Sequence, residues 1–175
     1  ETVSAIDTVD YSSLTGGVGI IADFNEASET IANTGKVTND GFSKTDTLYG
    51  IERIIGSSYA DNIIGDTNDG IDNTFEAGAG NDTLSGGSGA DSLYGETGND
   101  TLKGGIGDDK LYGGDNTAYT DGLTFTGDTA DYSDRSEKLL VTLGEGNIAT
   151  LDLDNDGFEA SGDEYDTLYG IENIT

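Results

Sequence analysis

Apolar residues in the middle of the chain recur with a period of nine. Residues 77–112 divide into the blocks AGAGNDTLS, GGSGADSLY, GETGNDTLK and GGIGDDKLY, and the eighth position of every block is leucine: Leu84, Leu93, Leu102 and Leu111. The last three residues of each block predict a short strand whose middle residue points inward. One block cannot bury its leucine alone, so the blocks are expected to stack and to gather the leucines into one core.

Polar and glycine positions follow the same period. The sixth position is always aspartate: Asp82, Asp91, Asp100 and Asp109. Glycines that permit positive φ come before them and predict tight turns with exposed carbonyls; they include Gly78, Gly80, Gly87, Gly89, Gly98, Gly105 and Gly107. If two blocks form one coil of a parallel roll, blocks n and n+2 stack on the same side. We therefore expect Asp82 beside Asp100, and Asp91 beside Asp109, with turn carbonyls completing cation sites.

Two degenerate blocks precede this run. Residues 56–64, GSSYADNII, keep Asp61 in the aspartate slot, and residues 65–76 place Asn73 there after a short insertion. Asp61 is expected to extend the row of Asp82, and Asn73 the row of Asp91. Glu96 replaces the second glycine of its block and Ala77 replaces a first glycine, so we expect weaker or remodelled sites at those turns.

A longer repeat surrounds the nine-residue blocks. DTVDYS (7–12) returns as DTADYS (128–133), NDGF (39–42) returns at 155–158, and DTLYGIERI (46–54) returns as DTLYGIENI (166–174). The period is roughly 120 residues, which suggests a slice of a tandem array. We expect a flanking segment over 1–55, a roll over 56–116 and a second, truncated copy of the flanking segment over 117–175.

The flanking segments are predicted to be β-rich. Residues 17–24 and 138–143 are apolar enough for strands, and 147–161 alternates around an Asn-Asp-Gly turn that is typical of a hairpin. Residues 25–33 suggest a short helix, and the apolar residues around Leu48 and Ile54 suggest an irregular coil that caps the stack. The predicted fold class is therefore all-β: a parallel β-roll, or β-helix, flanked by strand and hairpin capping segments.

A separate acidic motif lies near the C-terminal end. Asp152, Asp154 and Asp156 form DxDxDG, the opening of an EF-hand-type calcium loop. Phe158 would then provide a backbone carbonyl, and Asp163 stands where that loop usually has glutamate. A plain hairpin is the alternative, because the first copy keeps the turn with Lys36 and Thr38 in place of the first two aspartates. Asp115, Asp121 and Asp128, just past the roll, are weaker candidates for calcium ligands, and the pattern favours solvated loop carboxylates at these positions.

Composition excludes several functions. The chain has 7 Lys and Arg against 35 Asp and Glu, a formal charge of −28, and it has no His and no Cys. Such a chain has no Ser-His triad, thiol nucleophile or His/Cys metal site, and its charge argues against nucleic acid as a partner. No apolar run suggests membrane insertion. Since only 33% of its 175 residues are hydrophobic, folding requires something that cancels the charge, and divalent cations with oxygen ligands do so.

The blocks resemble the GGxGxDxUx nonapeptide of the RTX (repeat-in-toxin) family, strongly over 77–114 and fairly over 56–76. This resemblance implies a β-roll that holds several Ca²⁺ ions in its turns. It also implies type I secretion of an unfolded chain that folds outside, and so a secreted, extracellular or bacterial cell-surface location. The partners that we expect are calcium and the neighbouring repeats of the parent chain, and we expect the chain itself to be a monomer.

We therefore expect a calcium-dependent structural module of a large adhesin-like protein. The alternatives are an accessory RTX module of a secreted enzyme or toxin and, more remotely, an ice-binding roll. HExxH and GxSxG with a histidine are absent, so we expect no catalysis in this chain. Tyr94 and Tyr112 should stack on the outer face of one sheet, which favours cross-strand stabilisation over sugar binding.

Overall fold

The computed structural model describes residues 6–24, 34–38, 45–68, 70–115, 127–134, 140–143, 148–152 and 165–175. Their strands form two sheets of eight. The first sheet has the order β1 (Thr8–Asp10), β5 (Arg53–Ile55), β7 (Thr74–Glu76), β9 (Ser92–Thr97), β11 (Lys110–Asp115), β15 (Tyr165–Tyr169), β14 (Ile148–Asp152) and β13 (Leu140–Leu143). The second has the order β16 (Asn173–Ile174), β12 (Thr129–Ala130), β10 (Thr101–Ile106), β8 (Thr83–Ser88), β6 (Asn62–Ile64), β2 (Ile21–Asp23), β3 (Thr34–Thr38) and β4 (Asp46–Tyr49).

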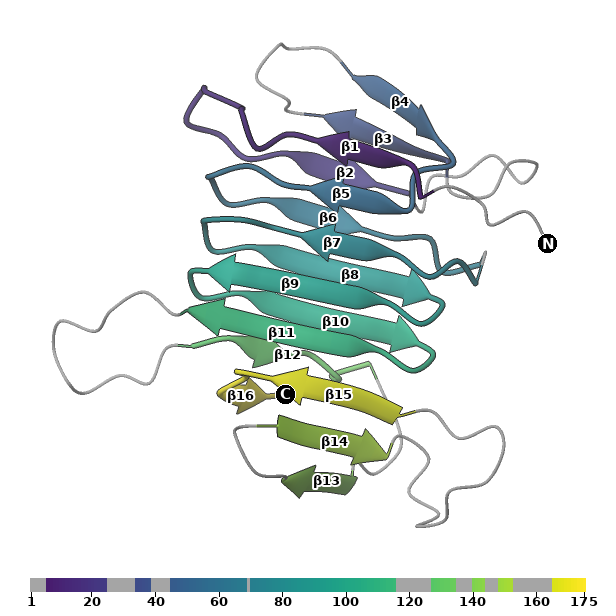
Figure 1. Ribbon diagram of the computed structural model, residues 1–175, viewed down its shortest axis with the longest axis vertical. Helices are drawn as coiled ribbons and strands as arrows, with labels where there is room; N and C mark the ends of the chain where they lie inside the picture. The colour runs from purple at the N-terminus through teal and green to yellow at the C-terminus, as the bar shows by residue number, and fades with distance from the viewer. Residues whose placement is uncertain are drawn as a thin grey trace, which may run out of the picture.

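Successive strands from β5 to β12 alternate between the two sheets, so each pair of blocks completes one coil (Figure 1). Within a sheet these strands are parallel, with Leu84 opposite Leu102 and Leu93 opposite Leu111. This is the predicted stacking of blocks n and n+2. The predicted all-β parallel roll is confirmed, and the described residues contain no helix that could span a membrane.

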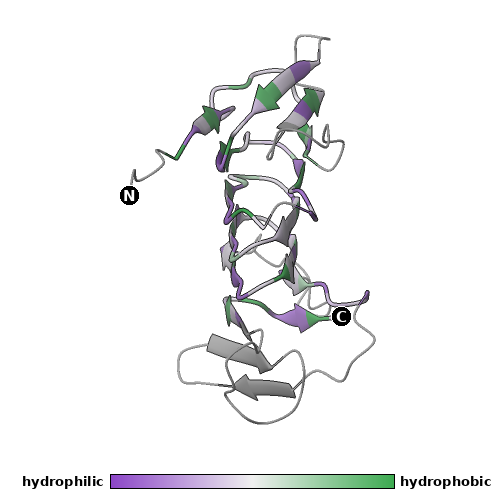
Figure 2. Cartoon of the chain, turned by 90° about the vertical axis from the view of Figure 1, so that its right-hand side faces the viewer, coloured by the Kyte–Doolittle hydropathy of each residue, from purple (hydrophilic) through white to green (hydrophobic). Residues whose placement is uncertain are grey.

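The core is a single column between the two sheets, which Figure 2 shows as two walls around a narrow interior. Leu84, Leu93, Leu102 and Leu111 are all 0% exposed, as the nine-residue period predicts. Ile54, Ile63 and Phe75 extend the column through the degenerate blocks, and Leu168 extends it into the second flanking copy. The apolar residue of every coil therefore stacks on its counterpart one coil away.

Both flanking copies are built alike. In the first, β1 pairs in parallel with β5, while β2, β3 and β4 form an antiparallel unit; in the second, β12 pairs with β16, while β13, β14 and β15 form the same unit. The predicted strands within 17–24 and 138–143 are confirmed as β2 and β13. The segment expected to form an irregular capping coil holds β5, which lies between β1 and β7 in the first sheet, and β4, which is an edge strand of the second. The predicted helix at 25–33 and the Asn-Asp-Gly turns lie outside the described residues.

Candidate metal centre

One row of acidic side chains runs along the edge where the coils turn. The amide of Asp61 donates to Oδ1 of Asp82 (2.7 Å), the amide of Asp82 to Oδ1 of Asp100 (2.8 Å), and the amide of Asp100 to Oδ1 of Asp128 (2.8 Å). Each carboxylate thus joins its own turn to the turn one coil earlier. The predicted pairing of Asp82 with Asp61 and Asp100 is confirmed.

A second row runs along the opposite edge. Here the amide of Asn73 donates to Oδ1 of Asp91 (2.7 Å), the amide of Asp91 to Oδ1 of Asp109 (2.8 Å), and the amide of Asp109 to Oδ1 of Asp166 (2.9 Å). Asp91 therefore pairs with Asp109, 18 residues away, as the roll geometry predicts.

Both rows continue into the second flanking copy, beyond the residues that the sequence analysis assigned to them. Asp128 is 0% exposed, so its description as a solvated loop carboxylate is wrong, whereas Asp115 is exposed as expected. Asp166, also 0% exposed, was missed. The insertion after residue 115 breaks the nine-residue spacing and conceals both positions. A usable signal was present, because DTLYG at 166–170 repeats the Asp-x-Leu-Tyr-Gly spacing of 91–95 and 109–113.

The second oxygens of three carboxylates in the first row lack hydrogen-bond partners within the described part of the chain. Oδ2 of Asp82, Asp100 and Asp128 is buried and accepts no hydrogen bond there. A buried polar atom without a partner is costly, and a buried charge costs more. The first row therefore presents a series of oxygen atoms that a cation would satisfy.

Backbone carbonyls converge on the same places. A Cβ added to Gly95 would collide with Oδ2 of Asp100 and lie 2.7 Å from the carbonyl oxygen of Gly113. A Cβ on Gly86 would likewise collide with Oδ2 of Asp91 and lie 2.6 Å from the carbonyl oxygen of Gly104. The first glycine of a block is thus required for space, because a carboxylate and a carbonyl approach there, and its φ is not positive.

Glycines at the second and fourth positions do adopt positive φ, as predicted: Gly78, Gly80, Gly87, Gly89, Gly98, Gly105 and Gly107. Glu96, the substitute for a second glycine, keeps the turn with a φ of 70°. It is the non-glycine residue with positive φ among the described residues. The turn is therefore retained at a cost in backbone strain.

Burial and mutual repulsion make the charged form of these aspartates unfavourable without a cation. Burial raises the pKa of Asp82 to about 7, and the nearby charges of Asp100, Asp61 and Glu96 contribute. Burial also raises the pKa of Asp128 to about 6, and it raises the pKa values of Asp61 and Asp100. The first row therefore lacks the positive charge that would stabilise its carboxylates in the ionised form.

The donor set fits a hard divalent cation. Calcium takes about 6–8 oxygens at 2.3–2.6 Å, and the turns bring carboxylate and backbone carbonyl oxygens together. In the described part of the chain no three acidic side chains gather into one cluster. Carbonyls would therefore have to supply a large part of each coordination shell, which agrees with the convergence at Gly95 and Gly86.

The other candidate loop is not described. Asp152 lies in β14, opposite Leu140 and Tyr165, but its side chain and Asp154, Asp156, Phe158 and Asp163 lie outside the described residues. The calcium-loop and hairpin interpretations of that segment both stay open. The predicted tyrosine stack is present: the rings of Tyr94 and Tyr112 lie 4.5 Å apart, and Tyr169 extends the stack at 4.4 Å from Tyr112.

Comparison with known proteins agrees with this geometry. Residues 46–69, 67–102 and 85–117 match the family of RTX calcium-binding nonapeptide repeats, in four copies. The roll of this chain therefore belongs to the RTX calcium-binding nonapeptide repeats. Repeats of this family generally bind calcium, form structural modules without catalytic activity, and occur in proteins that bacteria typically secrete. No curated protein matches the chain.

Proposed function

We propose that this chain is a calcium-dependent structural module of a large secreted or cell-surface protein of the adhesin type, delivered by type I secretion. The observation that carries the proposal is the pair of aspartate rows, in which the buried Oδ2 atoms of Asp82, Asp100 and Asp128 accept no hydrogen bond from the residues that the structure describes. Such rows repel each other in a chain with a charge of −28. A cation that binds only the folded state then supplies stability by linkage.

In this proposal Asp82 and Asp100 serve ions of one row, and Asp91 and Asp109 serve ions of the other. Asp61 and Asn73 extend the rows at one end, and Asp128 and Asp166 at the other. The carbonyls of the glycine turns complete each site. The division into a flanking segment (1–55), a roll (56–116) and a second flanking copy (117–175) is part of the proposal, with calcium concentrated in the roll.

Far-UV circular dichroism of the chain, titrated with calcium after treatment with EDTA, tests this function. Extracellular calcium modules often bind with dissociation constants of roughly 10⁻⁴ to 10⁻³ M, so the β signal should appear in that range and disappear on chelation. Magnesium at the same concentration is the control, because it demands near-octahedral geometry and dehydrates reluctantly. A β spectrum unaffected by EDTA would refute the proposal.

A row-specific variant sharpens the test. Asp91→Ala removes a carboxylate whose Oδ1 accepts the amide of Asn73, one coil earlier in the second row. We expect it to weaken calcium binding in its own row more than in the row of Asp82 and Asp100. Calcium stoichiometry by isothermal titration measures this, with Asp115→Ala as the matched control because Asp115 is exposed. Equal losses at every site would contradict the two-row arrangement.

A further inference from the structure

The two flanking copies share one local geometry. The amide of Asp7 donates to Oε2 of Glu52 at 2.9 Å, and the amide of Asp128 donates to Oε2 of Glu172 at the same distance. The amides of residues 52 and 53 donate to the carbonyl of Asp7, as those of residues 172 and 173 do to the carbonyl of Asp128. The first copy is therefore already folded in the arrangement that the second copy uses.

The second copy uses this arrangement to cover the end of the roll. Its strand β12 pairs with β10, with Thr129 opposite Thr101, and its strand β15 pairs with β11, with Thr167 opposite Lys110. Asp128 and Asp166 accept the amides of Asp100 and Asp109 and are 0% exposed. Tyr169 stacks on Tyr112 in the same interface.

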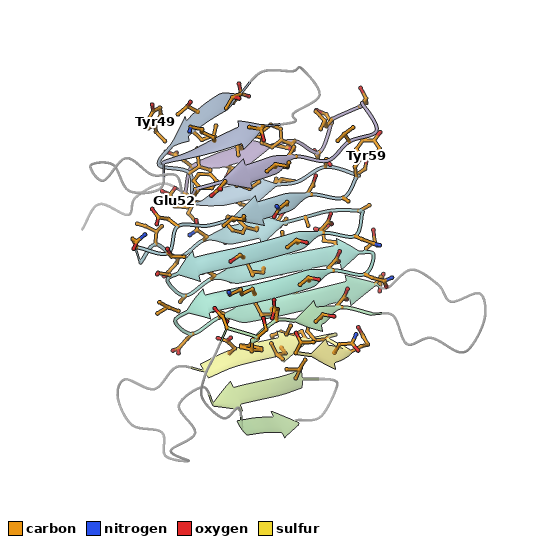
Figure 3. The ribbon with its side chains drawn as sticks, turned by 180° about the vertical axis from the view of Figure 1, so that it is seen from behind. Tyr49, Glu52 and Tyr59 are labelled. Carbon is orange, nitrogen blue, oxygen red and sulfur yellow. The ribbon has the colours of Figure 1, made fainter. Side chains whose placement is uncertain are left out.

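On the corresponding surface of the first copy, no described strand pairs with the outer edges of β1 and β4. Its strands β1 and β4 are the edge strands of the two sheets and lie at the same end of the stack (Figure 1). Asp7 and Asp46, the counterparts of Asp128 and Asp166, are exposed. Tyr49, the counterpart of Tyr169, is 59% exposed and projects from this end (Figure 3). Exposed edge strands readily pair with another strand.

We propose that the surface formed by β1 and β4 binds the end of a roll in a preceding copy of the same repeat unit, in the register that β12 and β15 use. Asp7 and Asp46 accept the amides equivalent to those of Asp100 and Asp109, and so extend both aspartate rows across the boundary. Tyr49 extends the stack equivalent to Tyr94 and Tyr112. This inference deepens the proposed function and rests on it.

The occupant is a roll end because this chain already contains that interface once. The sequences DTxDYS and DTLYGIE recur in both copies, and both copies keep the same internal hydrogen bonds. An intact second chain offers no open roll end, since β12 already pairs with β10 and β15 with β11. The boundary therefore forms between consecutive units of one polypeptide, and each unit closes the roll before it.

An extended chain tests the proposal. It consists of residues 1–127 followed directly by residues 7–175, so residues 7–55 occur twice. The second occurrence, here called the inner copy, directly follows the first roll. The sequence contains no Cys, so two introduced cysteines form a unique pair. Tyr112→Cys in the first roll and Tyr49→Cys in the inner copy should form a disulfide in calcium, because paired residues on adjacent strands lie within the Cα separation that disulfides span. Tyr112→Cys with Tyr169→Cys in the original chain is the reference pair.

The mismatched control replaces Tyr94 instead of Tyr112 in the first roll, one strand further from the boundary. We expect the inner cysteine pair to form a disulfide to the same extent as the reference pair. The mismatched pair should remain as free thiols. Equal oxidation of the inner and mismatched pairs, or failure of the first roll to fold in calcium, overturns the inference.

A second readout does not depend on disulfide geometry. Asp46→Asn in the inner copy should raise the calcium midpoint of the extended chain, whereas the same substitution in its N-terminal copy, where Asp46 is exposed, should leave the midpoint unchanged. Equal effects at the two positions overturn the inference. The calcium titration of the original chain separately decides the proposed function, so a failure of one is distinguishable from a failure of the other.

Discussion

At the scale of single residues, Glu96 shows what the turn demands. It holds a φ of 70° at a position where other blocks have glycine, and its charge contributes to the raised pKa of Asp82. Glu96→Gly should therefore stabilise the calcium-loaded fold by up to about 1 kcal/mol, because glycine adopts this conformation without steric cost. Urea unfolding at saturating calcium measures the change.

Glu96→Ala is the matched control for that prediction. It removes the carboxylate but keeps the Cβ that is strained at positive φ. A gain with glycine and none with alanine identifies backbone strain as the cause. An equal gain with both residues would show that the charge, rather than the backbone conformation, dominates at this turn.

At the scale of the strands, the leucine column decides stability. Leu93 lies in β9 at 0% exposure, between Phe75 and Leu111 on neighbouring strands. Leu93→Ala should cost about 2–5 kcal/mol of unfolding free energy at saturating calcium, through lost burial and a residual cavity. Ile106→Ala is the control, since Ile106 is 56% exposed and surface substitutions usually change stability by less than about 0.5 kcal/mol. Similar losses for the two would contradict the column as the core.

Periodicity made these strands predictable, and its interruption marks where prediction failed. Each nine-residue block predicts one strand, one turn and the block on which it stacks. The pairing of Asp91 with Asp109 therefore followed from the spacing alone. The places of Asp128 and Asp166 did not, because they depend on strands that return to the roll after insertions of irregular length.

At the scale of the whole molecule, the two flanking copies use opposite sides of one antiparallel unit. In the first copy β2 pairs with the roll strand β6, whereas in the second β15, the counterpart of β4, pairs with the roll strand β11. The same unit can therefore pair with a roll before it and a roll after it. This is the arrangement that a continuous array of such units requires, and at the boundary present in this chain the aspartate rows continue into the flanking copy.

The acidity of the molecule predicts opposite effects of pH with and without calcium. In the calcium-free fold, burial raises the pKa of Asp82 to about 7 and that of Asp128 to about 6, whereas an unfolded aspartate titrates near 3.9. Between about 4 and 7 the folded state thus binds more protons than the unfolded state, so its stability rises as pH falls. In EDTA the chain should therefore be more folded at pH 5 than at pH 8.

With calcium present the sign reverses, because ligand carboxylates must be deprotonated and protons compete with the cation. The calcium midpoint should rise as pH falls through about 7 to 6, where Asp82 and Asp128 take up protons. Circular dichroism at a series of pH values measures both the folded fraction in EDTA and the calcium midpoint. The chain has no His that would titrate in this pH range. Asp82→Asn should weaken the pH dependence of stability in EDTA and the pH dependence of the calcium midpoint, since the carboxylate of Asp82 contributes to both. A calcium-free chain that is more stable at pH 8 than at pH 5 would show that the buried carboxylates do not control folding.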